Sequence, residues 1–216
     1  YHLALVPLLL RTNADIYYTR DSLTAALLVL IRKGRKGKVF YEAHSFPGSR
    51  IGLALQRWLV PRLDALIVLT ELLAQRYVDL EIPPRRVAVI SDAVDIDVFG
   101  RCSKAEARKE LGVGKNDFLV MYVGQMYKWK GVETLVAAAA FLSDDTHVWL
   151  VGGTPEELPR IEKLLSAPGA DLVKLVGYVA PTQIPTCLAA ADVLALPNSG
   201  QTAVSRYYTS PLKLFE

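Results

Sequence analysis

119-LVMYVGQMYKWKGVETLVAAAAFL-142 has the clearest structural pattern in this chain: an apolar run opens into a glycine and then two lysines. Residues 118–123 favour a strand, Gly124 ends it, and the Ala- and Leu-rich residues after Lys130-Gly131 have helical periodicity. A strand, a glycine turn with cations and a helix make up half of a mononucleotide-binding unit. Because helix N-termini attract phosphate, the stretch predicts a phosphate site; an ordinary strand–helix turn with a solvated lysine is the alternative.

The composition indicates a globular protein of one large or two small domains. The chain has 216 residues, of which 51% are hydrophobic and 22% charged. A net charge of +3, with no zinc spacing and no aromatic–basic interleaving, gives no support to nucleic-acid binding. Cys102 and Cys187 lie outside any CxxC motif, which fits reduced thiols in a cytosolic setting. No apolar run reaches the ~18 residues that a membrane span requires.

Strands and helices alternate along both halves of the chain, and this pattern predicts parallel sheets covered by helices, an α/β fold. Residues 91–117 break the rhythm and are expected to hold a linker at 99–117, between domains at 1–98 and 118–216. The expected strands are 14–20, 38–44, 65–70, 86–90, 118–123, 146–152, 172–177 and 192–197. The expected helices are 21–33, 49–59, 71–80, 103–111, 131–142, 156–166 and 181–190.

Neither GxGxxG nor GxxxxGK[ST] occurs, so classical dinucleotide oxidoreductases and P-loop NTPases are disfavoured. Two nucleotide-type sheets without these loops indicate a GT-B arrangement, in which two Rossmann-like domains face each other across a cleft. The motifs that agree with this are VGQMYKWKG, WLVGGTPEE, LVGYVAPTQIPTCLAAADVLALP and SPLKLFE in the second half, and VFYEAHSFPG and VAVISDAVDIDVF in the first.

In their order and spacing these motifs resemble the retaining glycosyltransferases of family 4. The resemblance covers roughly residues 14–216 and suggests a chain truncated at both ends. It implies a GT-B enzyme that moves a sugar from a nucleoside-diphosphate sugar to an acceptor hydroxyl with retention, in polysaccharide or glycolipid synthesis. Residues 1–98 would be the acceptor-side domain, and residues 118–216 would be the donor-binding domain.

The resemblance also implies a set of donor-binding residues. Lys130 would bind the diphosphate, and Gln125 stands where the family usually has arginine, so it brings a hydrogen bond without a charge. Glu216 matches the glutamate that contacts the ribose, whereas Tyr208 stands where an earlier glutamate is usual. A helix start at Ser210, with Lys213, would make a second anion site. The full set is Gly124, Gln125, Lys130, Gly152, Gly153, Tyr178, Val179, Ser210, Lys213 and Glu216.

On the acceptor side, His44 is the expected catalytic residue. It ends an apolar strand two residues after Glu42, and side chains two apart in a strand share a face. In the family, a histidine at this position lines the catalytic cleft and approaches the donor sugar. Glu42 could orient His44 or satisfy a local amide. Gly48 and Arg50 follow in a loop-to-helix turn and complete the expected acceptor side.

A basic run, 32-RKGRKGK-38, lies between an expected helix and strand. Such a run is usually a solvated surface, but it would also attract anionic lipid and suit a lipid-linked acceptor. The expected location is therefore the cytoplasm, and peripheral contact with the inner face of the membrane is the more specific hypothesis. The cations concerned are Arg32, Lys33, Arg35, Lys36 and Lys38.

We expect no cofactor, with the nucleoside-diphosphate sugar acting as co-substrate, and no metal ion, because Lys130 and backbone amides can offset the diphosphate charge. The sequence shows no convincing carboxylate pair for double displacement. The resemblance implies retention by same-face attack, with the leaving phosphate as base. Two rivals stay open: an inactive nucleotide-binding GT-B protein, and a GT-B phosphorylase or epimerase. No stretch resembles the pyridoxal lysine site that a phosphorylase needs.

Overall fold

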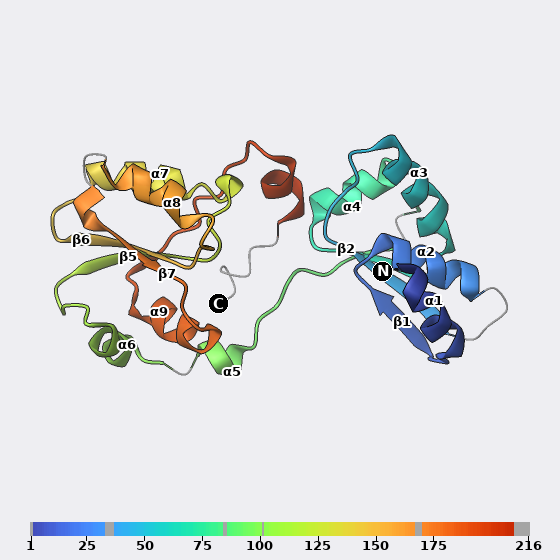
Figure 1. Ribbon diagram of the computed structural model, residues 1–216, viewed down its shortest axis with the longest axis horizontal. Helices are drawn as coiled ribbons and strands as arrows, with labels where there is room; N and C mark the ends of the chain where they lie inside the picture. Colours follow the sequence, from blue (N-terminus) through green and yellow to red (C-terminus); the bar gives the residue numbers. More distant parts are fainter. Residues whose placement is uncertain (1, 33–36, 84–85, 101, 167–169, 210–216) are drawn as a thin grey trace. The chain divides into compact units, whose positions relative to one another are not determined.

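The computed structural model describes residues 2–32, 37–83, 86–100, 102–166 and 170–209 (Figure 1). These residues form two compact units. The first holds residues 2–92 together with 206–209, and the second holds residues 93–205. The chain therefore leaves the first unit, builds the whole second unit and then returns to the first.

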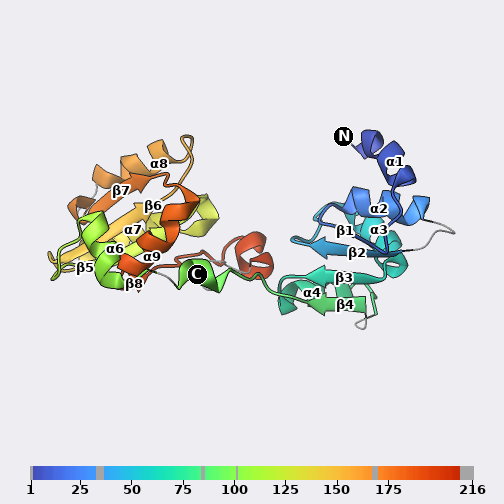
Figure 2. The ribbon, with the colours of Figure 1, turned by 90° about the horizontal axis from the view of Figure 1, so that it is seen from below.

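The first unit contains four parallel strands that lie side by side in sequence order (Figure 2). They are β1 (Ile16–Thr19), β2 (Lys38–Ala43), β3 (Ala65–Val68) and β4 (Val87–Val89), preceded or connected by the helices α1 (His2–Arg11), α2 (Ser22–Ile31), α3 (Arg50–Leu59) and α4 (Glu71–Val78). A short 3-10 helix, Val60–Arg62, follows α3 at Pro61.

Three helices of this unit begin at a capping side chain, within one residue of the expected helix starts at 21, 49 and 71. The side chains of Asp21, Ser49 and Thr70 each accept a hydrogen bond from a backbone N–H three residues further on. Helices α2, α3 and α4 then bury their apolar residues against the strands. Their shared core includes Ala25, Leu28, Val39, Leu59, Leu66, Leu73 and Tyr77.

The second unit contains a parallel sheet in the order β7-β6-β5-β8. Figure 1 shows α7 and α8 on one face of this sheet and α6 and α9 on the other. Because β8 pairs on the opposite side of β5 from β6, the strand order reverses at β5, and open α/β sheets bind ligands beside such a reversal. The strands are β5 (Phe118–Val123), β6 (Thr146–Val151), β7 (Val173–Gly177) and β8 (Val193–Leu194). The helices are α5 (Ile96–Phe99), α6 (Lys104–Leu111), α7 (Val132–Ala138), α8 (Leu158–Glu162) and α9 (Ile184–Ala190).

Short 3-10 helices extend several of these elements. They span Lys128–Lys130, Ala139–Phe141, Lys163–Ser166, Ala170–Leu172 and Pro181–Gln183, and a π-helix spans Val204–Tyr208. The expected helix 131–142 is therefore an α-helix only to Ala138, and the expected strand 192–197 pairs only at Val193–Leu194. Two helices were not expected: α1, which contains Pro7, and α5, which Asp95 caps.

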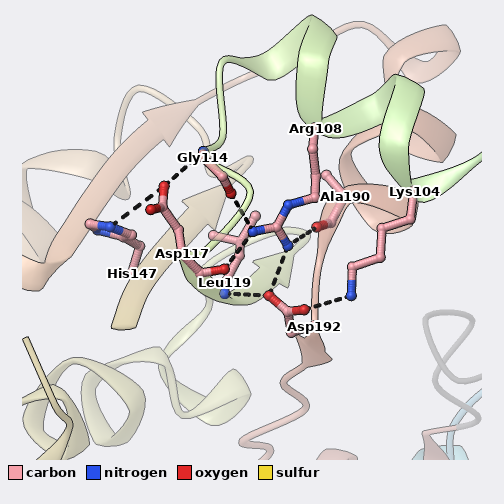
Figure 3. A network of polar contacts seen from close by, with 8 residues as sticks. All are labelled: Lys104, Arg108, Gly114, Asp117, Leu119, His147, Ala190 and Asp192. Atoms are coloured by element: carbon pink, nitrogen blue, oxygen red, sulfur yellow. Dashed lines mark hydrogen bonds and ion pairs between the residues drawn. The ribbon is translucent and has the colours of Figure 1, made fainter. Parts of the chain in front are cut away.

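Asp192 fastens β8 to β5 at the end of the sheet where these strands begin (Figure 3). Its backbone N–H donates to the Leu119 carbonyl at 2.8 Å, and its carboxylate accepts from the Leu119 N–H at 2.7 Å. The carboxylate also contacts Lys104 at 2.5 Å and Arg108 at 2.9 Å. The Leu119 hydrogen bond and these two cations hold the pKa of Asp192 well below its usual 3.8. The cluster is a structural tie, in which the Asp192 carboxylate pairs with both cations.

Arg108 extends this tie to the loop before β5. Its guanidinium donates to the carbonyls of Gly114, Asp117 and Ala190. The residue is 9% exposed, so this planar group fixes three backbone segments inside the unit. Within the described part of the chain, no helix is long and apolar enough to cross a membrane.

Candidate functional site

A cavity of about 440 Å³ lies at the carboxyl ends of β5, β6 and β7, inside the second unit. Its volume falls within the range of ~300–1,000 Å³ that small-molecule sites occupy. Six of the expected donor-binding residues line it: Gly124, Gln125, Gly152, Gly153, Tyr178 and Val179. The rest of its lining is Phe99, Val123, Thr154, Pro181 and Ile184. The structure thus brings together residues that are more than 50 positions apart in the sequence.

Glycine turns lock the three strand ends together beneath the cavity. The Gly152 N–H donates to Gly177 at 2.7 Å, and the Gly153 N–H donates to Gly124 at 3.1 Å. Gly152 has φ +107°, and a Cβ at this position would lie 2.3 Å from the Gly124 carbonyl oxygen. No larger residue fits there, because the backbone of the neighbouring turn fills the space. The floor of the cavity is therefore bare backbone.

Glu157 connects the two turns from β5 and β6, a role that was not predicted from the sequence. One carboxylate oxygen accepts from the Met126 N–H at 3.1 Å and from the Thr154 N–H at 2.9 Å. Arg160, one turn further on, donates to the Met126 carbonyl. The signal for this role was the Glu in 153-GTPEE-157, three residues after Thr154 at the start of a helical region.

Gln125 lines this cavity, whereas Lys130 does not. Gln125 is exposed and lines the cavity, while its carbonyl accepts a 2.5 Å hydrogen bond from the buried Tyr122 hydroxyl. Burial raises the pKa of that hydroxyl, so it stays a donor. Lys130 does not line the cavity: it ends a 3-10 helix before Gly131, and its ammonium lies 4.3 Å from the Trp129 ring centroid.

Gly131 brings the Lys130 turn against the end of β8. It has φ +72°, and a Cβ there would lie 2.0 Å from the Pro197 carbonyl oxygen. The Trp129 carbonyl accepts a 3.0 Å hydrogen bond from the Ser199 N–H. The lysine turn is therefore held next to the place where the strand order reverses, beside β5. Its role in binding diphosphate stays a prediction.

The expected donor-binding residues Ser210, Lys213 and Glu216 lie outside the described residues. Tyr208, at the position of the family's earlier glutamate, is 8% exposed and belongs to the core of the first unit. Its side chain is therefore buried among apolar groups of that unit.

In the first unit, Glu42 and His44 meet as their spacing predicts. His44 Nε2 lies 2.5 Å from Glu42 Oε1, and the same oxygen lies 3.1 Å from the Arg20 guanidinium. Glu42 is 5% exposed, whereas the His44 side chain is 39% exposed. A buried carboxylate thus holds an accessible imidazole at the carboxyl end of β2. Of the two expected partners of Glu42, the structure shows His44. The catalytic role of His44 stays a prediction.

The other expected acceptor-side residues are exposed. Gly48 lies in the loop after His44, and a Cβ there would meet no atom within 4 Å. Arg50 opens α3 directly after its cap, Ser49. Both are therefore accessible to solvent, and neither is fixed to Glu42 or His44 by a contact within the described residues.

The basic run is only partly described. The Arg32 guanidinium lies 2.8 Å from the Asp64 carboxylate, so part of its charge is used inside the unit. Lys38 is exposed at the start of β2, and Lys33, Arg35 and Lys36 lie outside the described residues. Across the part of the chain that the structure describes, no three His, Cys, Asp or Glu side chains are grouped so that they could hold a metal ion.

Comparison with known proteins gives several relatives in sequence, including the following two. The D-inositol 3-phosphate glycosyltransferase of Mycolicibacterium vanbaalenii is 32% identical over 167 residues, which cover 68% of this chain and 36% of that protein. The alpha-galactosylglucosyldiacylglycerol synthase of Streptococcus pneumoniae is 26% identical over 144 residues, which cover 63% of this chain and 38% of that protein. The chain thus spans well under half the length of these curated relatives.

Solved structures share the fold. Anabaena HepE in complex with UDP superposes with a TM-score of 0.74 at 18% identity, covering 91% of this chain and 56% of HepE. HepE in complex with UDP-glucose gives a TM-score of 0.70 at 19% identity, over 90% and 56% of the two chains. Together with the two parallel four-stranded sheets, this likeness confirms the expected GT-B fold class.

Two family matches cover most of the chain. "Glycosyltransferase Family 4" matches residues 1–98, and "Glycosyl transferases group 1" matches residues 117–216. They agree in extent with the motifs quoted from each half of the sequence. The chain therefore belongs to the glycosyltransferases, with a family 4 domain in its first half and a group 1 domain in its second.

Proposed function

We propose that the full-length protein transfers a sugar from a nucleoside-diphosphate sugar to an acceptor hydroxyl with retention of anomeric configuration, without a metal ion. The observation that carries this proposal is the cavity at the carboxyl ends of β5, β6 and β7, lined by the glycine turns of all three strands. Bare backbone lets a ligand approach closely. The complexes of HepE with UDP and with UDP-glucose support a nucleotide sugar as the ligand.

Two groups, the exposed Tyr178 and the half-buried Lys130, suit the two ends of such a donor. Tyr178 is 77% exposed at the cavity, so its ring offers a free face on which a nucleobase can stack. Lys130 lies in the turn after β5, and an ammonium there would offset the charge that grows on the departing diphosphate. Gln125 adds a neutral hydrogen-bond donor, so we expect weaker diphosphate binding than an arginine would give.

In the proposed reaction, the bond from the anomeric carbon to the diphosphate oxygen breaks as the acceptor oxygen attacks from the same face. The departing diphosphate oxygen takes the proton of the acceptor hydroxyl, so no protein nucleophile is needed. His44, held by the buried Glu42, would support the positive charge that develops on the donor sugar or position the acceptor. These interactions belong to the transition state and would therefore appear in kcat.

For the acceptor, we propose a glycan or a lipid-linked hydroxyl. The names of the two sequence relatives, an inositol phosphate glycosyltransferase and a glycolipid synthase, support a hydroxylated acceptor of this kind. We further propose a cytoplasmic protein that contacts anionic lipid at the inner face of the membrane through the basic run. Flotation with vesicles containing anionic lipid tests this. Binding that survives replacement of Lys33, Arg35, Lys36 and Lys38 by Gln would contradict it.

The deciding experiment measures transfer and donor hydrolysis by the full-length protein with UDP-, GDP- and ADP-sugars, with and without EDTA, and determines the product anomer by NMR. His44→Ala should lower kcat by roughly 100-fold while nucleotide affinity stays constant. His147→Ala, a surface histidine of the second unit, is the matched control and should turn over normally. A fully active His44→Ala variant would remove His44 from the reaction.

An inactive nucleotide-binding protein is the second candidate, and it is favoured by Gln125 and by the burial of Tyr208. It predicts that the protein binds UDP, GDP or ADP in calorimetry yet neither transfers nor hydrolyses any sugar of the panel. Retained binding without turnover would therefore replace the proposed enzyme by this candidate.

A further inference from the structure

Residues 206–209, here called the return segment, pack against the first unit although the whole second unit precedes them in the chain. The Thr70 hydroxyl donates to the Tyr207 carbonyl at 2.6 Å, across a separation of 137 residues. Tyr208 is 8% exposed within the core of the first unit, and Tyr207 packs on the same core. The return segment is therefore an integral part of this unit.

The return segment meets the first sheet at the edge that carries His44. Ala43 of β2 pairs with Val68 of β3, so His44 and Thr70 leave neighbouring strands at the same end. Thr70 both caps α4 and holds the Tyr207 carbonyl. Because this is the carboxyl edge of the sheet, the return segment borders the side on which open α/β sheets bind their ligands.

Arg76 links the return segment to the loop after His44. Its guanidinium carbon lies 5.8 Å from the Tyr207 ring centroid and 4.8 Å from the Phe46 ring centroid. Both distances are within the ~6 Å over which a guanidinium and an aromatic face attract each other. Phe46 also packs edge-on against the fully buried Tyr77, with ring centroids 5.2 Å apart. One cation thus joins a ring of the return segment to a ring only two residues after His44.

Phe46 packs on the core of the first unit and fixes the loop just after two exposed residues. His44 and Ser45 are exposed, whereas Phe46 is half-buried. Glu42 fixes the imidazole from one side, and Phe46 fixes the chain that follows it. A loop held at both ends keeps the imidazole in one geometry, whereas a loop held at one end can shift, and a misplacement of about 1 Å at a reacting centre costs up to ~100-fold in rate.

We infer that Arg76 and Tyr207 are positioning residues for His44: the return segment braces the His44 loop through the Tyr207–Arg76–Phe46 contacts. This inference rests on the proposed function in so far as it assigns His44 a part in sugar transfer. The brace acts through Phe46 within the first unit, so we expect it to affect the placement of the imidazole and to leave nucleotide binding in the second unit unchanged.

The test uses the full-length protein with Arg76→Met and Tyr207→Ala, which each remove one side of the brace. Tyr207→Phe keeps the ring and serves as the conservative variant. Arg62→Met is the matched control, because Arg62 lies over Trp58 in the same unit at 4.9 Å but has no contact with the His44 loop among the described residues. Melting temperature is recorded for every preparation, so that activity is expressed per folded molecule.

We expect Arg76→Met and Tyr207→Ala to lower kcat by about 10-fold or more, with UDP affinity and donor KM within about twofold of wild type. Tyr207→Phe and Arg62→Met should keep wild-type kcat. A loss of kcat in Arg62→Met equal to that in Arg76→Met would overturn the inference, since a general loss of packing would then explain both. So would wild-type kcat in Arg76→Met and Tyr207→Ala.

A second readout does not depend on turnover. The ring signals of His44 in ¹H–¹⁵N spectra can be assigned as those that disappear in His44→Gln. At fixed pH these signals should shift in Arg76→Met and Tyr207→Ala and stay in place in Arg62→Met. If the wild type transfers no sugar, the proposed function fails, and the ring signals alone decide the positioning: unmoved signals would refute it.

Discussion

Gly152→Ala should disrupt the floor of the cavity, and the structure gives the size of the effect. A Cβ at Gly152 would lie 2.3 Å from the Gly124 carbonyl oxygen, whereas real Cβ contacts are essentially never under 3.0 Å, so this backbone would have to move by about 0.7 Å. The positive φ of +107° costs about 1–3 kcal/mol for an L residue. Weakening the Gly153–Gly124 hydrogen bond adds about 1 kcal/mol, for a total of about 2–4 kcal/mol.

Gly112→Ala is the matched control for this substitution. Gly112 also has a positive φ, +69°, but a Cβ there would meet no atom within 4 Å. It therefore contributes backbone strain without a clash, and we expect a loss of about 1 kcal/mol and unchanged nucleotide binding. The difference between the two variants isolates the contact between the turns from β5 and β6.

The assay follows urea unfolding of the second unit by tryptophan fluorescence in a Trp58→Phe background, where only Trp129 and Trp149 report. Calorimetry measures UDP affinity on the same preparations. Gly152→Ala should lose at least about 10-fold in UDP affinity, because the turns that line the cavity separate. The reasoning is refuted if Gly152→Ala binds UDP like the wild type and is no less stable than Gly112→Ala.

Three further changes concern single side chains of the second unit. Lys130→Ala should weaken UDP binding by about 1.5–3 kcal/mol in calorimetry, and unchanged affinity would remove Lys130 from the site. Gln125→Arg should tighten UDP binding about 10-fold by adding a charge-assisted hydrogen bond, whereas weaker binding would contradict a phosphate beside Gln125. Asp192→Asn should lower the free energy of unfolding by about 1.5–3 kcal/mol at pH 7, because Lys104 and Arg108 lose their partner. The folded-state pKa of Asp192 is lowered, so its contribution to the free energy of unfolding is complete above pH 3.8 and is lost as the pH falls below that value. The free energies of unfolding of the wild type and Asp192→Asn should therefore converge in acid. A difference that stays constant with pH would argue against this tie.

Local patterns predicted the elements that local forces determine. The apolar runs became β2, β5, β6 and β7 with nearly the expected bounds, and α3 and α4 begin within one residue of the expected helix starts at 49 and 71. Such signals depend on neighbouring residues alone. The expected helix 131–142 is shorter because its last turn tightens into the 3-10 helix Ala139–Phe141. Helix α1 was missed because its apolar residues show no one-sided period and Pro7 is a poor helix former.

The candidate site divides in the same way. Spacing predicted that Glu42 and His44 share a face of their strand, and the structure shows the two side chains in contact. Gly124, Gly152 and Gly153 line the cavity, and their role in donor binding stays a prediction. Glu157 was missed because only its contact with Thr154 is local in 153-GTPEE-157, whereas the Met126 N–H lies 31 positions away in the sequence. The packing of Tyr207 against Arg76 was beyond reach as well, because no local signal encodes a contact between residues 131 positions apart.

The return of residues 206–209 to the first unit also has a consequence for synthesis on the ribosome. The core that Tyr208 enters is otherwise complete after residue 92, and residues 93–205 must be translated before Tyr208 emerges. At ~5–20 residues per second, that interval lasts roughly 6–20 s. During this interval the apolar surface that Tyr208 later covers, beside Thr70, is exposed on the nascent first unit. A chaperone could recognise this surface. The chain itself covers it only after residues 206–209 have been translated.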